Sequence, residues 1–235
     1  MAEQQPSDVD QWLKRETPRV RRALESASRY FDENDSLTVN TLEAIYGQES
    51  SFGTMLGTRG SARAAGHFQL QPETAKRYGL NVSKDNDQRF DIDYAASAAA
   101  RYLKDLDSMF SERKTSKVPD TIPVKSALER KKFVLGAYRA GEGRIAGAQR
   151  LAEKTGSDPQ SWSEVRQLLE PAGADEFTAE GTRRYVERVP AYEMEFARKS
   201  PANKKLKQKA AKKERVRCTV GRWRTIDGRP VFICA

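Results

Sequence analysis

The sequence lacks the features that mark three common classes of protein. No stretch approaches the roughly 20 consecutive apolar residues of a membrane-spanning helix, so we expect none. A single histidine, His67, and two widely spaced cysteines, Cys218 and Cys234, argue against a zinc site, and we predict neither a metal nor a cofactor. The first ten residues are polar and acidic, without the basic and apolar regions of a secretory leader, so no conventional export signal is expected.

Excess positive charge is also absent from most of the chain. The net charge is +9, yet residues 198–217 alone carry +9 and residues 218–235 carry +2, which leaves −2 on residues 1–197. A basic groove across the main body is therefore not expected, and we predict no binding to nucleic acid. Residues 198–217 are predicted to be a basic linker or helix that attracts an anionic envelope polymer or a membrane surface. A solvated, partly helical segment is the alternative.

Apolar residues recur at helical spacing along the body, where strand signals are absent. Residues 8–31 predict a helical lead-in interrupted near Pro18, and residues 38–49 carry an apolar stripe that ends at Glu49. The glycine-rich residues 50–66 predict an irregular loop that leaves room for a groove. Further helices are predicted at 71–78, 88–110, 126–139, 143–154, 161–170 and 178–198.

Strand signals appear only at the C-terminus. The Asp-Gly dipeptide at 227–228 is a two-residue turn signal between two short runs rich in β-forming residues. In the resulting hairpin register Trp223 is opposite Phe232. Cys234 is not opposite Cys218, so a disulfide between them needs a bulge or a fold-back, and this pairing stays open.

Glu49 is the candidate catalytic residue. Cleavage of a glycosidic bond near neutral pH requires a protonated acid, and a carboxyl group gains the raised pKa most simply by desolvation in an apolar environment. A glutamate at the end of an apolar stripe and next to a glycine-rich loop has such a position. A solvated or helix-capping glutamate is the alternative that the position alone leaves open.

Four ordered segments lie around and beyond Glu49. They are IYGQESSFG at 45–53, AGHFQLQPETA at 65–75, AYRAGEGR at 137–144 and TRRYV at 182–186. In order and spacing they resemble the motifs of the soluble lytic transglycosylase family, which are E-S-x-F/G, G-L-M-Q-L-x-P-x-T-A, A-Y-N-A-G-x-G-x-V and E-T-x-x-Y-V. The resemblance spans about residues 40–190, and four motifs in order are far more specific than one.

The resemblance implies a mainly α-helical, lysozyme-like fold of the goose type, with a groove for the glycan strands of peptidoglycan. It implies that Glu49 first protonates the glycosidic oxygen. As a carboxylate, Glu49 then takes the proton of the muramic acid 6-hydroxyl, which closes a 1,6-anhydro ring without water. We expect the enzyme to be a monomer. Since its substrate lies outside the cytoplasm, we expect delivery by a phage, at lysis or with the virion, or by a dedicated secretion route.

The resemblance also implies a set of substrate-binding residues around the catalytic glutamate. They are Ser50, Gly66, Phe68, Gln69, Tyr138, Arg139 and Tyr185. The chain departs from the family pattern at position 139, where Arg replaces Asn, and at 67 and 68, where His and Phe replace Leu and Met. Packing roles are the alternative for Tyr138, Tyr185 and His67.

Two other functions stay open at this stage. A hydrolytic muramidase needs a second carboxylate near Glu49, and the candidates are Asp85, Asp87, Asp91 and Glu142. A catalytically inactive, peptidoglycan-binding protein is the other. Four parts are predicted: a helical lead-in at 1–36, a lysozyme-like domain at 37–197, the basic segment at 198–217 and the hairpin at 218–235.

Overall fold

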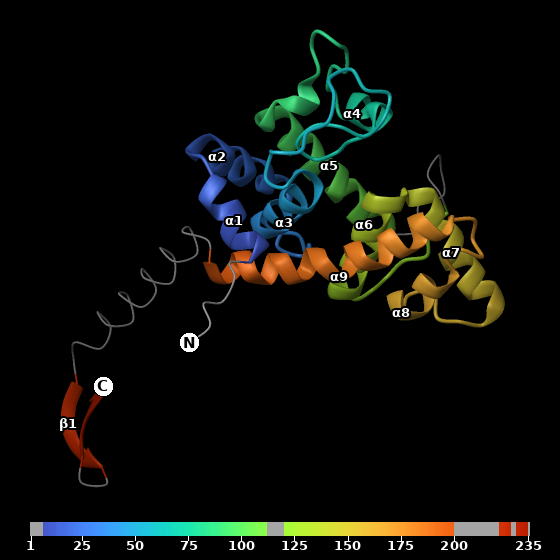
Figure 1. Cartoon of the computed structure of the whole chain (residues 1–235). Helices are drawn as coiled ribbons and strands as arrows, with labels where there is room; N and C mark the ends of the chain where they lie inside the picture. The colour runs from blue at the N-terminus through green and yellow to red at the C-terminus, as the bar shows by residue number, and fades with distance from the viewer. Residues whose placement is uncertain (1–6, 112–119, 200–220, 227–228, 235) are drawn as a thin grey trace, which may run out of the picture. The chain divides into compact units, whose positions relative to one another are not determined.

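The computed structural model describes residues 7–111, 120–199, 221–226 and 229–234 (Figure 1). The chain forms two compact units, Met1–Met194 and Glu195–Ala235. The described residues are mainly helical, as the sequence predicts.

Helices account for almost all regular structure of the described residues up to Lys199. They are α1 (Asp8–Arg15), α2 (Pro18–Ala27), α3 (Val39–Ser50), α4 (Pro72–Arg77), α5 (Ile92–Ser111), α6 (Ala127–Ala140), α7 (Glu142–Thr155), α8 (Trp162–Val165) and α9 (Glu176–Lys199), with 3-10 turns η1 (Ser28–Tyr30), η2 (Gln88–Phe90) and η3 (Arg166–Leu168). The helices predicted from apolar spacing are confirmed to within a few residues, and the break near Pro18 separates α1 from α2. The predicted irregular loop follows α3.

Side-chain caps set where the first helices begin. The Ser7 hydroxyl accepts a hydrogen bond from the Asp10 amide at the start of α1, and Thr38 and Thr41 cap α3 reciprocally. Because α3 begins at a capped position and ends in a sharp turn, its length is fixed. Glu49 is thereby held in the last turn of this helix.

The central helix of the first unit is α5, which packs against α2, α3 and α6 (Figure 1). Five of its alanines have no exposed surface: Ala95, Ala96, Ala98, Ala99 and Ala100. Small side chains let neighbouring helices approach closely. This packing places the helices that carry the sequence motifs around one core.

The last helix, α9, ties α3 to α6. Glu193 of α9 accepts a hydrogen bond of 2.8 Å from the Thr41 hydroxyl of α3 and forms an ion pair with Lys131 of α6. In Figure 1 α9 runs along both of these helices. Glu193 is thus joined directly to residues 152 and 62 positions earlier in the chain.

The N-terminal helices dock onto α3. Trp12 of α1 is buried, and a Cβ on Gly47 of α3 would lie only 2.3 Å from its indole ring. Arg21 of α2 pairs with the fully buried Glu43 of α3 at 2.7 Å and with Glu16 at 2.6 Å. The helical lead-in predicted from the sequence therefore packs against α3 and supports it.

The second unit contains two strands, β1 (Gly221–Ile226) and β2 (Arg229–Cys234), paired antiparallel. Trp223 is opposite Phe232, which is the register that the turn signal predicts.

The predicted basic segment lies largely outside the described residues, as does Cys218 and with it the question of the disulfide. Within the described part of the chain, no helix combines the length and the apolar content that crossing a bilayer requires.

Candidate active site

Glu49 lies in the last turn of α3, directly before a sharp turn of the backbone. Ser51 and Phe52 both adopt left-handed backbone conformations, with φ of 47° and 59°. Such conformations cost about 1–2 kcal/mol for residues other than glycine, and strain of this kind collects at functional sites. The Ser50 hydroxyl stabilises this turn with two hydrogen bonds. It donates to the Tyr46 carbonyl at 3.0 Å and accepts from the Gly53 amide at 3.1 Å.

The Glu49 carboxyl group is poised to carry a proton near neutral pH. Burial raises its pKa to about 7. The nearby Tyr185 hydroxyl and the positive charge of Arg139 both lower this pKa, but together they offset only part of the rise. The side chain is half-buried, so the desolvated carboxyl still opens toward a ligand.

Two tyrosines flank this carboxyl group. The Tyr138 and Tyr185 rings stack with their centroids 6.4 Å apart and their planes 14° from parallel. Burial and the charge of Glu49 raise the pKa of both phenols well above 10, so both remain protonated donors. Tyr138 donates to the Phe68 carbonyl at 2.9 Å. The buried Tyr185 hydroxyl makes no hydrogen bond of good geometry, so its contact with Glu49 is loose.

The tyrosine pair continues into a longer aromatic row. The ring centroids of Tyr102 on α5 and Tyr138 are 5.4 Å apart, and those of Tyr78 and Tyr102 are 5.6 Å apart. The Tyr102 hydroxyl donates to Glu142 at 3.1 Å, and Glu142 in turn pairs with Arg77 at 3.2 Å. The row thus connects the core helix α5 to the candidate site and fixes the position of Tyr138.

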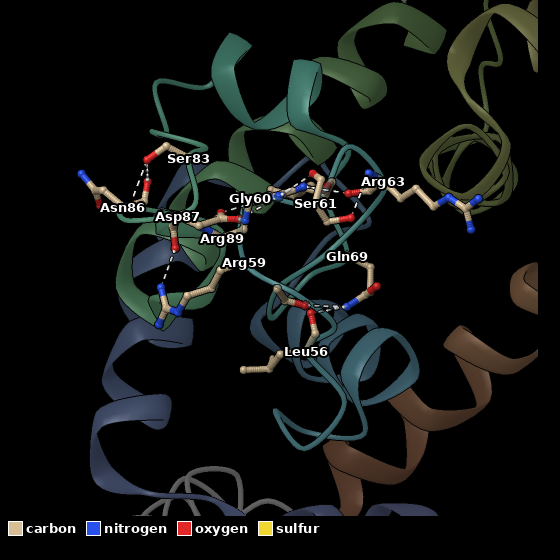
Figure 2. A network of polar contacts seen from close by, with 12 residues as sticks. Leu56, Arg59, Gly60, Ser61, Arg63, Gln69, Ser83, Asn86, Asp87 and Arg89 are labelled. Atoms are coloured by element: carbon tan, nitrogen blue, oxygen red, sulfur yellow. Dashed lines mark hydrogen bonds and ion pairs between the residues drawn. The ribbon is translucent and has the colours of Figure 1, made fainter.

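The loop that follows α3 turns tightly at Gly66. Its φ is +81°, and a Cβ there would lie 2.1 Å from the Arg89 carbonyl oxygen, so only glycine fits. The Gly66 amide donates to the Leu56 carbonyl at 2.7 Å. The Gln69 amide nitrogen donates to the Gly66 carbonyl at 2.8 Å, and its weaker contacts reach the preceding loop (Figure 2).

A buried arginine clamps the same loop. Arg89 is 1% exposed, and its guanidinium group forms two hydrogen bonds to Asp87, of 2.9 and 2.7 Å. Its guanidinium also donates to the carbonyls of Ser61, Arg63 and Leu70 (Figure 2). Burial opposes ionisation of Asp87, but hydrogen bonds from Arg89 and from the Gly60 amide outweigh it and lower the pKa of Asp87. The guanidinium group of the buried ion pair therefore finds hydrogen-bond acceptors in Asp87 and in the loop carbonyls.

Residues 27–160 match the family model described as the Transglycosylase SLT domain. The chain belongs to this family. Its helical, lysozyme-like fold is that of the family, as the motifs predict. The match ends before α9, so the SLT-domain model does not include Tyr185, which the fold nevertheless brings to Glu49.

Curated relatives carry the name membrane-bound lytic murein transglycosylase F. The protein from Enterobacter sp. (strain 638) is 35% identical over 128 residues, which are 54% of this chain and 21% of that protein. Those from Cronobacter sakazakii and Salmonella typhimurium are each 34% identical over 128 residues, with the same coverage. The chain thus spans about a fifth of the length of these relatives.

The SLT fold assembles most of the residues that the motifs single out. Tyr185 and the charge of Arg139 act on Glu49, and Tyr138 stacks on Tyr185. The loop from Gly66 to Gln69 joins them through the hydrogen bond from Tyr138 to the Phe68 carbonyl. Three distant segments of the sequence therefore meet at one carboxyl group.

Two of the predicted substrate-binding residues, Phe68 and Ser50, have completely buried side chains. Phe68 is completely buried and stacks on Tyr46 at 5.5 Å, so its side chain packs in the core and only its carbonyl serves the site. Ser50 is also completely buried, and both of its hydrogen bonds lie within the turn that follows Glu49. A motif match gives a position and not an orientation, so a role of either residue in substrate binding stays a prediction.

Three of the four carboxylates considered as partners for a muramidase reaction form ion pairs elsewhere. Asp87 pairs with Arg89, Asp91 with Arg19 at 3.0 Å and Glu142 with Arg77. Asp85 is exposed on the turn before η2. Among the described residues, the charge that acts on the pKa of Glu49 comes from Arg139, and no carboxylate does so.

His67 has a packing role in this SLT domain. Burial lowers its pKa, its Nδ1 atom is buried without a hydrogen bond, and its ring lies 5.5 Å from Tyr46. It is therefore neutral near pH 7 and does not serve as a second acid. The clamp residue Arg89 was not predicted as part of the site, since no local pattern marks an arginine that tertiary contacts bury.

Proposed function

We propose that this protein is a peptidoglycan lytic transglycosylase that cleaves the β-1,4 bond between N-acetylmuramic acid and N-acetylglucosamine. Family membership and the printed names of the relatives support this activity. The observation that carries the proposal is a single half-buried carboxyl group, Glu49, with a pKa of about 7 and no second carboxylate acting on it among the described residues.

In the first step Glu49 acts as the acid. Near pH 7 a large fraction of its carboxyl groups is protonated, so the proton passes to the glycosidic oxygen as the bond to C1 of the muramic acid breaks. The departing N-acetylglucosamine leaves with that proton as a free hydroxyl group. Glu49 becomes a carboxylate, which the positive charge of Arg139 and the Tyr185 hydroxyl stabilise.

In the second step the same carboxylate acts as the base. It takes the proton of the muramic acid 6-hydroxyl while that oxygen bonds to C1, which closes the 1,6-anhydro ring and restores the protonated Glu49. No water is consumed, and the proton balance is zero over the cycle. A single carboxyl group is sufficient for both steps, in contrast to the two that hydrolytic glycosidases use.

The loop over the site offers groups that can hold the sugar. The amide nitrogen of Gln69 is committed to loop carbonyls, while its side-chain oxygen makes no hydrogen bond to the described residues. We assign this oxygen as an acceptor for a sugar hydroxyl or amide. The positive φ of Gln69, 46°, and the tight turn at Gly66 hold it in place. The site of action that follows is the bacterial cell wall.

The test is digestion of purified sacculi followed by mass spectrometry of the products. The wild type should release muropeptides with anhydro ends, and Glu49→Gln should release none, because the amide cannot donate or accept the proton. Glu73→Gln is the matched control, since Glu73 is an exposed glutamate paired with Lys76 on α4. Reducing ends from the wild type would indicate a muramidase, and binding without products would indicate an inactive binding protein; either result contradicts the proposal.

A further inference from the structure

Arg139 is a cation of the candidate site that no carboxylate of the described residues neutralises. It lies in the last turn of α6, directly after Tyr138, and it is exposed. It makes no hydrogen bond and no ion pair within the described parts of the chain, so its charge acts on Glu49 without direct contact. The dipole of α6 favours a cation in the last turn, but this preference does not determine where the guanidinium group lies.

The guanidinium group of Arg139 lies against Gly181 of α9. The three atoms nearest to a Cβ built on Gly181 are Nη2, Nε and Cζ of Arg139, at 3.4, 3.9 and 4.0 Å. An added methyl group would therefore only touch the guanidinium group, whereas a longer side chain would compete with it for the same space. The absence of a side chain at position 181 lets Arg139 lie directly on α9.

The fold itself does not require glycine at position 181. Gly181 lies inside α9 with ordinary helical backbone geometry. Within a helix glycine is less stable than alanine, because it loses more conformational freedom on folding. Positions 139 and 181 also depart together from the motifs, since Arg139 replaces the Asn of the third motif and Gly181 replaces the Glu of the fourth. The two residues that depart from the pattern therefore contact each other in the structure.

The contact between Arg139 and Gly181 continues the contact between the two tyrosines at Glu49. Gly181 precedes Tyr185 by four residues, so both lie on the same face of α9, about 6 Å apart along the helix axis. Tyr138 stacks on Tyr185, and Arg139, the next residue of α6, lies on Gly181. The same two helices therefore bring a hydroxyl group and a positive charge to the Glu49 carboxyl group.

We propose that Gly181 is a positioning residue that holds the Arg139 guanidinium group at the active site by leaving space for it on α9. The inference rests on the proposed function and deepens it. Gly181 touches no reacting atom and acts through Arg139. When Glu49 has given its proton to the glycosidic oxygen, a fixed positive charge nearby lowers the free energy of the carboxylate that remains. A side chain at position 181 should therefore weaken this effect although the arginine is still present.

The test is a carbon-13 NMR titration of the Glu49 carboxyl group in the full chain, with its signal assigned by its absence in Glu49→Gln. Arg139→Gln should raise the pKa of Glu49 by roughly half a unit, the effect of a partly solvated charge. Gly181→Leu should raise it by a similar amount, because leucine displaces the guanidinium group. Gly181→Ala is the matched control and should leave the pKa unchanged, since a methyl group only touches Arg139.

A double variant separates displacement of the charge from burial of Glu49 by the new side chain. If leucine acts by displacing Arg139, Gly181→Leu combined with Arg139→Gln should titrate as Arg139→Gln alone does. Arg139→Lys, which keeps the charge, should keep most of the wild-type effect. Gly181→Gln, with a polar side chain of similar length, provides the same comparison if leucine impairs folding.

Kinetics on sacculi gives a second readout. The kcat should fall roughly threefold in Gly181→Leu and in Arg139→Gln, the rate equivalent of half a pKa unit, and it should remain unchanged in Gly181→Ala. A wild-type pKa of Glu49 in Gly181→Leu and Gly181→Gln, or a shift that adds in full to that of Arg139→Gln, would overturn the inference. The titration needs no turnover, so a wild type that does not cleave sacculi would contradict the proposed function and leave this test intact.

Discussion

At the scale of single residues, the account depends on the proton affinity of Glu49. Its pKa is raised because the folded chain removes the carboxyl from water, and the two groups that favour the charged form only moderate this effect. The same environment that supplies a proton for catalysis makes the ionised form costly. The activity that needs the protonated acid and the stability contributed by this residue therefore both fall as the pH rises through about 7.

Replacement of Glu49 should stabilise the protein above neutral pH. The carboxyl has a pKa of about 7 when folded and 4.5 as its unperturbed value, so the folded state binds the extra proton between these limits. The contribution of this proton to the folding free energy of the wild type is fully present below pH 4.5 and is lost as the pH rises through 7. The stability of Glu49→Gln relative to wild type should rise by up to roughly 3 kcal/mol from pH 4.5 to pH 8. Urea unfolding at both pH values measures this, and a pH-independent difference would contradict a raised pKa.

Loss of the Tyr185 hydroxyl should impair turnover more than binding. The hydroxyl favours the carboxylate form of Glu49, so Tyr185→Phe should lower kcat roughly tenfold and leave KM nearly unchanged. The alkaline limb of the pH profile should also move upward by a fraction of a unit, because an influence that lowers the pKa is gone. Steady-state kinetics over pH 5–9 checks both. A higher KM with an unshifted limb would assign Tyr185 to substrate binding alone.

At the scale of elements, the site depends on the loop between α3 and α4 as much as on the helices. Arg89 satisfies several loop carbonyls at once, and Gly66 turns the chain where a side chain cannot fit. This loop carries Gln69 and receives the hydrogen bond of Tyr138 through Phe68. Its rigidity comes from buried polar contacts and not from regular structure.

Substitution of Gly66 should disrupt the loop far beyond the cost of its backbone conformation. Gly79 is the matched control, because it has a similar φ of +83° but no atom within 4 Å of an added Cβ. Gly79→Ala should cost about 1 kcal/mol, whereas Gly66→Ala should cost several kcal/mol and abolish activity. Thermal unfolding and sacculus digestion of both variants provide the comparison. Equal costs would mean that the contact with Arg89 is relieved by a small shift.

How much of this was accessible from sequence differs between elements. Helices were predictable because their buried faces repeat at helical spacing, and Glu49 was identifiable because motif order surrounds it. The orientation of Phe68 was not, since residues in an irregular loop have no periodicity that separates inside from outside. The Arg89 clamp depends on carbonyls that are 19 to 28 residues away, a relation with no local signature.

At the scale of the whole molecule, two flanking helices extend the SLT domain. Helix α1 packs against α3 through Trp12, and α9 places Tyr185 next to Glu49. The Tyr192 hydroxyl donates a hydrogen bond to Asp8, 184 positions away, and no local sequence pattern marks such a contact. Helix α9 thereby adds to the candidate site a side chain that lies outside the match to the family model.

The positively charged C-terminal segment should determine retention on the envelope. Nearly all of the excess charge lies after α9, so a chain that ends at Lys199 loses the attraction to anionic polymers. We predict weaker binding of the shortened chain to sacculi with attached anionic polymer at low salt, with turnover of soluble glycan unchanged. Co-sedimentation checks this, and equal binding of both forms at low salt would refute the proposed role.

The most direct test of the central claim is digestion of sacculi in water enriched in oxygen-18, followed by mass spectrometry of the new glycan ends. If Glu49 serves alone as acid and then base, the ends are 1,6-anhydro sugars without heavy oxygen, and each is lighter than a reducing end by the mass of one water. Reducing ends labelled with oxygen-18 would show that water attacks C1, which would contradict the account.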